Sequence, residues 1–254
     1  MNALSETVAT RMQEMGLQFM SASLESYLEE QSHSENTLLQ SLADLLELEY
    51  LPRKERAARS RLKLSGMPAV KRLEDFDISW LKGGLSARQI AELSSLSFIE
   101  RKENVVLMGP SGLGKSHLML ALGYKACMTE STVWYTSCID LIEGLTRARE
   151  QGRLKRRLTW LKKPRLIPID EVGYENLTKE QSNLLFQVVN ARYEHGSMIL
   201  TTNKAFGHWA EVLAEEAIAT ATIDRLLHHA HVFSLKGDSY RMKDRLKIGV
   251  VDPM

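Results

Sequence analysis

The chain has 254 residues, a formal net charge of +1, 44% hydrophobic residues and two cysteines. No apolar stretch is long enough to span a membrane, so the sequence excludes a protein with membrane-spanning helices. Cys127 and Cys138 lack the spacing of metal ligands, so it also excludes a metal site built on cysteines. We expect no signal peptide, a reducing compartment, buried cysteines and therefore a cytoplasmic protein. The length predicts one large domain and one small one.

Residues 1–63 are predicted to form a small, all-helical N-terminal domain, because apolar residues recur at helical spacing. Residues 1–50 carry nine acids and one base, whereas residues 53–63 carry six bases and one acid. A helix is expected to start at Asn36-Thr37. The leucines at 38, 39, 42, 45, 46 and 48 are expected to form a helical core, and a groove for a partner is the alternative. The basic segment is either a solvated helix face or an arm that follows nucleic-acid phosphates.

Residues 64–75 contain Gly66 and Pro68 and are predicted to be a linker before a second domain at 76–254. Phe76 stands just before the first predicted strand of that domain. It is expected to be a buried core residue, although an aromatic residue beside a nucleotide base is the alternative. A short amphipathic helix, with Ser86 as its cap, is expected over 86–96.

A phosphate-binding loop is predicted from the pattern G-x-x-x-x-G-K-S. Residues 104–108 are apolar and β-branched, and residues 117–126 have helical character, so the loop joins a buried strand to a helix N-terminus. Its glycines allow successive N–H groups to point at phosphate oxygens. Lys115 is expected to bind the β- and γ-phosphates of ATP, and Ser116 to bind Mg²⁺. The whole predicted cofactor-binding segment is Gly109, Pro110, Ser111, Gly112, Leu113, Gly114, Lys115, Ser116 and His117.

Residues 132–136 are predicted to form a second strand, and Asp140 is expected to cap the helix that follows to Glu150. Residues 153–165 then contain seven bases and no acid. Leucines at 154, 158 and 161 give this segment an apolar stripe. We interpret it as a DNA-facing helix rather than an ordinary amphipathic surface helix.

An acidic pair ends the next predicted strand, residues 166–171. Asp170 is expected to organise Mg²⁺, and Glu171 to polarise the attacking water as general base. Pro168 is an anomaly in this strand, because it cannot donate to the sheet ladder.

Asn176 or Thr178 is expected to open a helix that reaches Tyr193. The buried strand predicted over 198–203 ends in polar residues, so Asn203 is expected to sense the γ-phosphate, with a turn-forming role as the alternative. Helices are predicted over 206–213 and 217–229, and a last strand over 232–235. Three histidines, His228, His229 and His231, have no metal-like spacing and are expected to be surface or packing residues.

Alternating strands and helices predict an α/β fold: a three-layer core with a mainly parallel, five-stranded sheet and the ligand at the carboxyl ends of its strands. The order of phosphate loop, acidic strand end and polar strand end is typical of AAA+ ATPases.

The sequence also resembles a particular family, the IstB-type transposition helper ATPases of bacterial insertion sequences, over essentially the whole chain. The motifs that carry the resemblance lie at 109–118, 169–174, 190–194, 200–204, 224–230 and 239–243. The resemblance implies an ATP- and Mg²⁺-dependent ATPase that oligomerises on duplex DNA and works with a transposase. It also implies that an arginine from a neighbouring subunit completes the site, for which Arg192, Arg225 and Arg241 are candidates, each with a structural ion pair as the alternative.

Two other functions stay open at this stage. A helicase loader would use its acidic head to bind a replicative helicase and would act on single strands. A phosphate-loop kinase for a small molecule would need an acceptor-binding lid, and the acidic pair followed by a polar strand end argues against it.

Overall fold

A computed structural model describes residues 3–31 and 36–240, and these divide into two compact units, Met1–Ser60 and Arg61–Met254. The N-terminal unit is helical: α1 (Ala3–Glu14), α2 (Gln18–Gln31) and most of α3 (Leu38–Leu64), which continues into the second unit. Before α3, the Thr37 hydroxyl accepts the N–H of Gln40 at 3.3 Å, as an N-cap residue does.

Glu49 holds the N-terminal unit together. Its carboxylate is buried, accepts the N–H groups of Phe19 and Met20 at 2.8 and 2.9 Å, and pairs with Arg53 at 2.6 Å. Burial alone raises the pKa of Glu49, but the hydrogen bonds from Met20, Arg53 and Phe19 outweigh it and lower this pKa below its usual value. The first turn of α2 is therefore capped by a carboxylate from α3.

The leucine-rich start of α3 does not form the expected core. Leu38 is 88% exposed and Leu39 77%, and Leu42, Leu46 and Leu48 are exposed as well. Within the described part of this unit, the buried apolar residues are instead Met20, Leu24, Tyr27 and Ala58. The expectation was wrong because helical periodicity predicts an apolar face but not what covers it.

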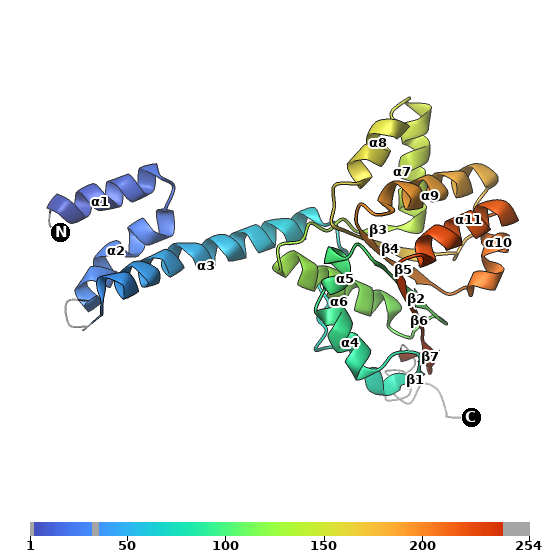
Figure 1. The fold of residues 1–254 in the computed structure, drawn as a ribbon, viewed down its shortest axis with the longest axis horizontal. Coiled ribbons are helices and arrows are strands. Elements are labelled where there is room, and N and C mark those ends of the chain that lie inside the picture. Colours follow the sequence, from blue (N-terminus) through green and yellow to red (C-terminus); the bar gives the residue numbers. More distant parts are fainter. Residues whose placement is uncertain (1–2, 32–35, 241–254) are drawn as a thin grey trace, which may run out of the picture. The chain divides into compact units, whose positions relative to one another are not determined.

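The C-terminal unit contains the expected parallel sheet, with strand order β3-β4-β5-β2-β6 (Figure 1). These strands are β2 (Asn104–Met108), β3 (Thr136–Ser137), β4 (Leu166–Val172), β5 (Ser197–Thr202) and β6 (Ala230–Ser234). A separate antiparallel pair joins β1 (Leu81–Gly83) to β7 (Lys236–Gly237).

Helices cover both faces of the sheet (Figure 1). One face packs on α4 (Ala87–Ser94), α5 (Ser97–Glu100) and α6 (Lys115–Met128), and the other on α7 (Cys138–Glu150), α8 (Leu154–Leu161), α9 (Lys179–Arg192), α10 (Trp209–Val212) and α11 (Glu216–Leu227). Short 3₁₀ turns occur at Ile78–Trp80 and Phe206–His208. Val105 and Leu107 point to the first layer and Val106 to the second, and all three are fully buried, as expected for a central parallel strand.

Pro168 has a structural explanation. Leu166 exchanges backbone hydrogen bonds with Thr132 and Trp134, so alternate residues of β4, Pro168 among them, direct their backbone groups toward the β3 side. Because Pro168 has no N–H to donate, the hydrogen-bond ladder between β4 and the chain before β3 is interrupted at Pro168. Val133 therefore forms only an isolated bridge with Leu166, separate from the two-residue strand β3. The strand predicted over 132–136 is therefore much shorter than expected.

Helix starts follow local capping chemistry. The Ser86 hydroxyl and Gln89 form a capping box at α4, and Thr178 and Gln181 form one at α9, as two of the predicted starts require. The prediction for α7 was wrong, because Ser137 is its cap and accepts the N–H of Asp140 at 3.0 Å. Both residue types suit a cap, and the strand that ends at Ser137 decides between them.

Arg192 is fully buried at the end of α9. Its guanidinium donates to the carbonyl oxygens of Leu161, Pro164, Arg165 and Ser197 at 2.6–3.2 Å. Gly196 leaves the space for it, since a Cβ there would lie 2.3 Å from an Arg192 nitrogen. Burial lowers the pKa of Arg192 to about 10, so it stays charged at neutral pH.

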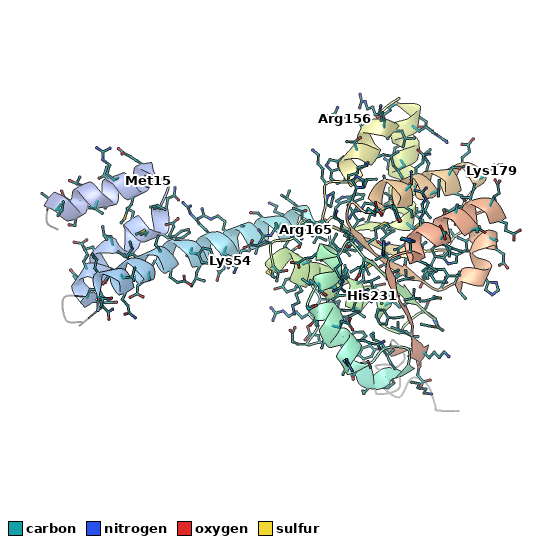
Figure 2. The ribbon with its side chains drawn as sticks, in the orientation of Figure 1. Met15, Lys54, Arg156, Arg165, Lys179 and His231 are labelled. Atoms are coloured by element: carbon teal, nitrogen blue, oxygen red, sulfur yellow. The ribbon has the colours of Figure 1, made fainter. Side chains whose placement is uncertain are left out.

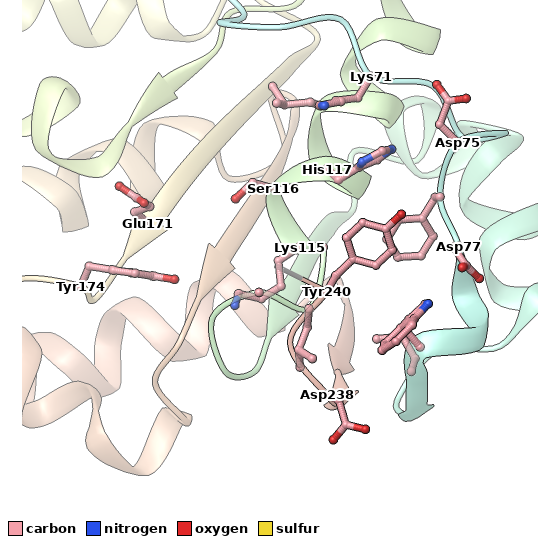
Figure 3. Close-up of a pocket in the computed structure, with 17 residues that line it drawn as sticks. Lys71, Asp75, Asp77, Lys115, Ser116, His117, Glu171, Tyr174, Asp238 and Tyr240 are labelled. Atoms are coloured by element: carbon pink, nitrogen blue, oxygen red, sulfur yellow. The ribbon is translucent and has the colours of Figure 1, made fainter. Parts of the chain in front are cut away.

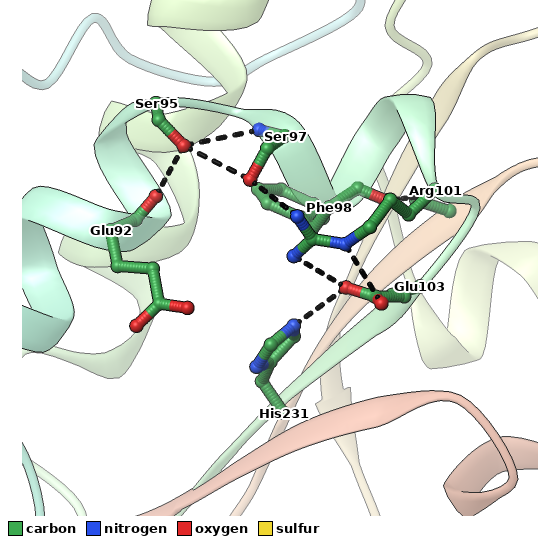
Figure 4. Close-up of polar contacts among 8 residues, drawn as sticks. Glu92, Ser95, Ser97, Phe98, Arg101, Glu103 and His231 are labelled. Carbon is green, nitrogen blue, oxygen red and sulfur yellow. Dashed lines mark hydrogen bonds and ion pairs between the residues drawn. The ribbon is translucent and has the colours of Figure 1, made fainter.

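A polar network forms where β2 and β6 begin, at the opposite ends of these strands from the phosphate loop (Figure 4). Glu103 bonds Arg101 at 2.9 Å and His231 Nε2 at 2.7 Å. The Arg101 hydrogen bond is the main reason that the pKa of Glu103 is lowered, against burial, and His231 adds to the effect.

Among the parts of the chain that the structure describes, no helix is both long and apolar enough to cross a membrane.

Candidate nucleotide-binding site

The predicted phosphate loop lies between the end of β2 and the first turn of α6. Gly112 and Gly114 have φ of +85° and +81°, which residues with a Cβ rarely adopt. A Cβ on Gly112 would lie 2.1 Å from the Ser239 hydroxyl, and one on Gly114 would lie 2.8 Å from the Phe76 ring. Close packing as well as backbone conformation therefore requires glycine at both positions.

The loop lysine is buried and held by the loop itself. Lys115 Nζ donates to the carbonyl oxygens of Gly109 and Pro110 at 2.6 and 2.7 Å. The neighbouring Leu113 anchors the loop, because it packs in the same buried cluster as residues of α4 and α6. The ammonium group is thus held at the loop, where the dipole of α6 also favours an anion.

The acidic strand end meets the loop, as the sequence predicts. Ser116 Oγ donates to Asp170 Oδ1 at 2.9 Å, although the residues lie 54 positions apart. The same oxygen accepts the hydroxyl of Thr201 and the N–H of Glu171. Asp170 and Thr201 are both buried. The role of Thr201 was not predicted from the sequence, where its only signal is a hydroxyl at the end of a buried strand.

Glu171 stands at an irregularity in β4. Its φ is +62°, and the pairing of β4 with β5 shifts register between Ile169 and Val172. This irregularity exposes the carboxylate of Glu171, unlike its buried neighbours, and places it in the lining of a cavity (Figure 3).

The cavity measures about 480 Å³, within the usual range for small-molecule sites. The phosphate loop forms one end of its lining, and aromatic residues form another part (Figure 3). Trp80 and Tyr240 lie 6.1 Å apart, edge to face, because β1 pairs with β7 and the Tyr240 N–H bonds the Gly112 carbonyl. The lining comprises Lys71, Asp75, Phe76, Asp77, Trp80, Leu81, Gly112, Leu113, Gly114, Lys115, Ser116, His117, Leu120, Glu171, Tyr174, Asp238 and Tyr240.

Phe76 and His117 line the cavity in contact with each other. Their rings lie 5.7 Å apart, and His117 Nε2 lies 3.1 Å from the Arg72 carbonyl. Phe76 is half-buried in the lining of the cavity and packs on the core beside α6. Phe76 is therefore half-buried rather than fully buried as expected, and its contact with a nucleotide base stays a prediction.

Tyr135 lies near the acidic pair, on the edge of the sheet. Burial, followed by the negative charges of Asp170 and Glu171, raises the pKa of Tyr135 to about 12. Its phenol therefore stays protonated at neutral pH. No role for Tyr135 was predicted from the sequence.

Asn203, Arg192 and Arg225 lie outside the cavity lining. Asn203 is exposed and follows the last residue of β5. Arg225 is half-buried on α11, with its guanidinium 5.6 Å from the Phe186 ring and 5.8 Å from the Tyr193 ring. Arg192 is fully buried on backbone carbonyl groups, so its role is structural, but through hydrogen bonds rather than the ion pair given as the alternative. Arg241 lies outside the described residues.

The basic segment at 153–165 contains α8. Arg157 packs against two indoles that contact each other, 4.9 Å from Trp134 and 4.5 Å from Trp160, and burial lowers its pKa. The other bases of the segment are exposed, and Arg156 extends from the surface of the unit (Figure 2). They are Arg153, Lys155, Arg156, Lys162, Lys163 and Arg165.

The fold is that of a AAA+ phosphate-loop protein. Its parallel sheet has the phosphate loop after β2 and the acidic pair at the end of β4, and the polar end of β5 lies between these two strands. The chain belongs to the IstB-like ATP binding protein family, whose model matches residues 10–248.

Curated relatives agree with this family. The chain is 40% identical over 235 residues to an insertion sequence IS21 ATP-binding protein of Pseudomonas aeruginosa, covering 92% of this chain and 88% of the relative. It is 41% identical over 201 residues to an insertion sequence IS5376 ATP-binding protein of Geobacillus stearothermophilus, covering 79% and 80%.

Solved structures share the fold. The chain is similar to DnaI, with a TM-score of 0.54 and 17% identity, over 65% of this chain and 91% of that one. It is also similar to a DNA replication initiation factor, with a TM-score of 0.52 and 18% identity, over 72% and 57%.

Proposed function

We propose that this protein is an ATP-dependent, DNA-binding helper that oligomerises on target DNA and recruits or activates a transposase for insertion-sequence transposition. The observation that carries the ATPase part is the contact of Ser116 and Thr201 with one oxygen of Asp170, beside the buried Lys115. The insertion-sequence origin named for the curated relatives supports the transposition part.

Each side chain of the site then has a task. Lys115 binds the β- and γ-phosphates, and the loop N–H groups cradle them. Ser116 and Asp170 offer the hard oxygen ligands that Mg²⁺ prefers. Mg²⁺, when bound, neutralises charge that develops on the phosphates. Glu171 accepts a proton from the attacking water, and Asn203 senses the γ-phosphate from the end of β5.

Duplex DNA is proposed to contact the exposed bases of the segment around α8. Lys155, Arg156, Lys162 and Lys163 make no ion pair with a carboxylate within the described residues, so their charge is available to phosphates. The basic part of α3 is a weaker candidate. Arg53 is bound to Glu49, and Arg61 donates to the Cys127 carbonyl at 2.8 Å.

DNA binding is tested by fluorescence anisotropy on duplexes of unrelated sequence, across a salt series, with and without ATP. We expect affinity that requires ATP, shows little sequence preference and falls steeply with salt. Arg156→Ala should reduce the slope of log K against log salt by about 1. The matched control is Arg88→Ala, an exposed arginine on α4, which should leave the slope unchanged. Binding that is indifferent to both salt and ATP contradicts the proposal.

Arg225 is proposed to act on the nucleotide of a neighbouring subunit, because it lines no part of the cavity in its own chain. Arg225→Ala should bind ATP but hydrolyse it slowly. Mixing it with Glu171→Gln subunits creates sites that hold both an intact Glu171 and a neighbour's intact Arg225. Recovered hydrolysis in the mixture supports the role in trans, and its absence contradicts it.

A transposase partner is distinguished from a helicase by co-purification with each. Capture of the transposase in an ATP-dependent manner supports the helper role, and capture of a replicative helicase alone supports the loader. An activity on chromosomal DNA would take place in the cytoplasm.

A further inference from the structure

Tyr174 connects the cavity lining to the phosphate loop, and the proposed reaction gives it no other role. Its hydroxyl lies 3.1 Å from Ser111 Oγ in the phosphate loop, 63 residues away in the sequence. Tyr174 also lines the cavity on the same side as Glu171 (Figure 3). A side-chain bridge therefore joins the phosphate loop to the segment that follows the acidic pair.

That segment is a tight turn in an uncommon conformation. Glu171 has φ of +62° without being glycine, Gly173 has φ of +84°, and the Tyr174 N–H reaches the Glu171 carbonyl at 3.4 Å. Such backbone is unfavourable for a residue with a Cβ and persists only where its surroundings hold it. Within the described residues, Asp170 and Thr201 accept the N–H of Glu171 at the start of this turn, and the Tyr174–Ser111 hydrogen bond ties its far end to the phosphate loop.

We propose that Tyr174 is a positioning residue for hydrolysis: through Ser111 it holds the Glu171 turn against the phosphate loop, and so sets the distance between the Glu171 carboxylate and the γ-phosphate. The inference rests on the proposed ATPase function and extends it to a residue pair outside the predicted acid, lysine and metal ligands. When the general base is displaced by a fraction of an ångström, ATP can still bind, but the carboxylate is no longer aligned with the attacking water.

A positioning role for Tyr174 predicts a slower rate of hydrolysis, whereas a purely structural role predicts lower stability. Tyr174 is 39% exposed and Ser111 is exposed, so removing either hydroxyl opens no cavity in the core. The effect should therefore fall on the chemical step, not on folding or on nucleotide affinity. A Tyr174 hydroxyl that bound the phosphates directly would instead weaken ATP binding.

The test is a double-mutant cycle with Tyr174→Phe, Ser111→Ala and both together, read as single-turnover ATP hydrolysis on DNA and as ATP affinity. We expect each single variant to slow hydrolysis about tenfold or more, and the double variant to be no slower than either single one, while Tyr174→Phe keeps ATP affinity within twofold of wild type. Ser111→Thr keeps the hydroxyl and should restore the rate. Tyr124→Phe, on α6 outside the cavity lining, is the matched control.

Additive effects, an unchanged rate or a loss confined to ATP affinity each overturn the inference. Thermal unfolding followed by tryptophan fluorescence checks the fold, and the Ser111 variants keep the test valid if Tyr174→Phe is unstable. Lys115→Ala and Glu171→Gln, measured alongside, distinguish a failure of this inference from a failure of the proposed ATPase function. If these abolish hydrolysis while Tyr174→Phe matches wild type, only this inference fails, and if they do not, the proposed ATPase function fails.

Discussion

Thr201 donates its hydroxyl hydrogen bond to Asp170 Oδ1, the same oxygen that Ser116 reaches from the phosphate loop. Thr201 also accepts the N–H of Glu171 at 2.9 Å. One buried threonine thus orients both members of the acidic pair.

Thr201→Val should therefore lower metal affinity and turnover without removing nucleotide binding. Groups that orient a metal ligand typically contribute ten- to a hundredfold, so the Mg²⁺ concentration for half-maximal hydrolysis should rise by about this factor. Mg²⁺ titration of ATP hydrolysis measures it. Thr201→Ser keeps the hydroxyl and should behave as wild type. Equal Mg²⁺ dependence in all three proteins would remove Thr201 from this role.

The edge-to-face pair of Trp80 and Tyr240 should hold the nucleotide base at the aromatic part of the cavity. Stacking on an aromatic ring contributes about 1–3 kcal/mol, so Tyr240→Ala should weaken ATP binding by about tenfold or more but leave binding of inorganic triphosphate unchanged. Competition calorimetry with both ligands measures the difference. ATP should also quench tryptophan emission in wild type and much less in Trp80→Phe, with Trp160→Phe as control. Equal losses for ATP and triphosphate would contradict base contact.

Arg192 should be a determinant of stability. Lysine cannot span the carbonyl oxygens that the Arg192 guanidinium joins, so Arg192→Lys leaves buried acceptors unsatisfied. We expect a loss of about 3 kcal/mol in the free energy of unfolding, measured by urea denaturation with tryptophan fluorescence. Arg156→Lys, on the exposed face of α8, should change it by less than about 0.5 kcal/mol. An Arg192→Lys protein of wild-type stability would contradict the structural role.

Glu103 should make stability depend on acidic pH. Its folded pKa lies below its unfolded value of about 4.3, so its contribution is present above that pH and is lost as pH falls through the folded pKa. Wild type should therefore melt at a higher temperature than Glu103→Gln at pH 7, and the gap should narrow below about pH 4. Thermal unfolding of both proteins from pH 7 to pH 3 measures it. A constant gap would show that Glu103 does not titrate in this way.

Features encoded by local residue patterns were predictable from the sequence. The parallel sheet, the phosphate loop and the contact between Ser116 and Asp170 follow from apolar strands with fixed polar ends, because parallel strands bring their carboxyl ends to one edge. The capping boxes at Ser86 and Thr178 are equally local.

Contacts between distant segments were not predictable. Trp80 and Tyr240 meet because β1 pairs with β7 across most of the C-terminal unit, and neither strand has enough alternating residues to be recognised. Arg192 misleads in another way, since an arginine is expected outside unless something pairs with it, and its partners here are backbone oxygens without any sequence signature.

The ATPase proposal is tested most directly by the nucleotide bound to, and hydrolysed by, Glu171→Gln and Lys115→Ala proteins on DNA. Radiolabelled ATP gives both quantities in one assay. We expect Glu171→Gln to retain ATP, hydrolyse it at least about a hundredfold more slowly than wild type and stay on DNA, while Lys115→Ala binds no nucleotide. Wild-type turnover in Glu171→Gln, or wild-type ATP affinity in Lys115→Ala, would contradict the proposal.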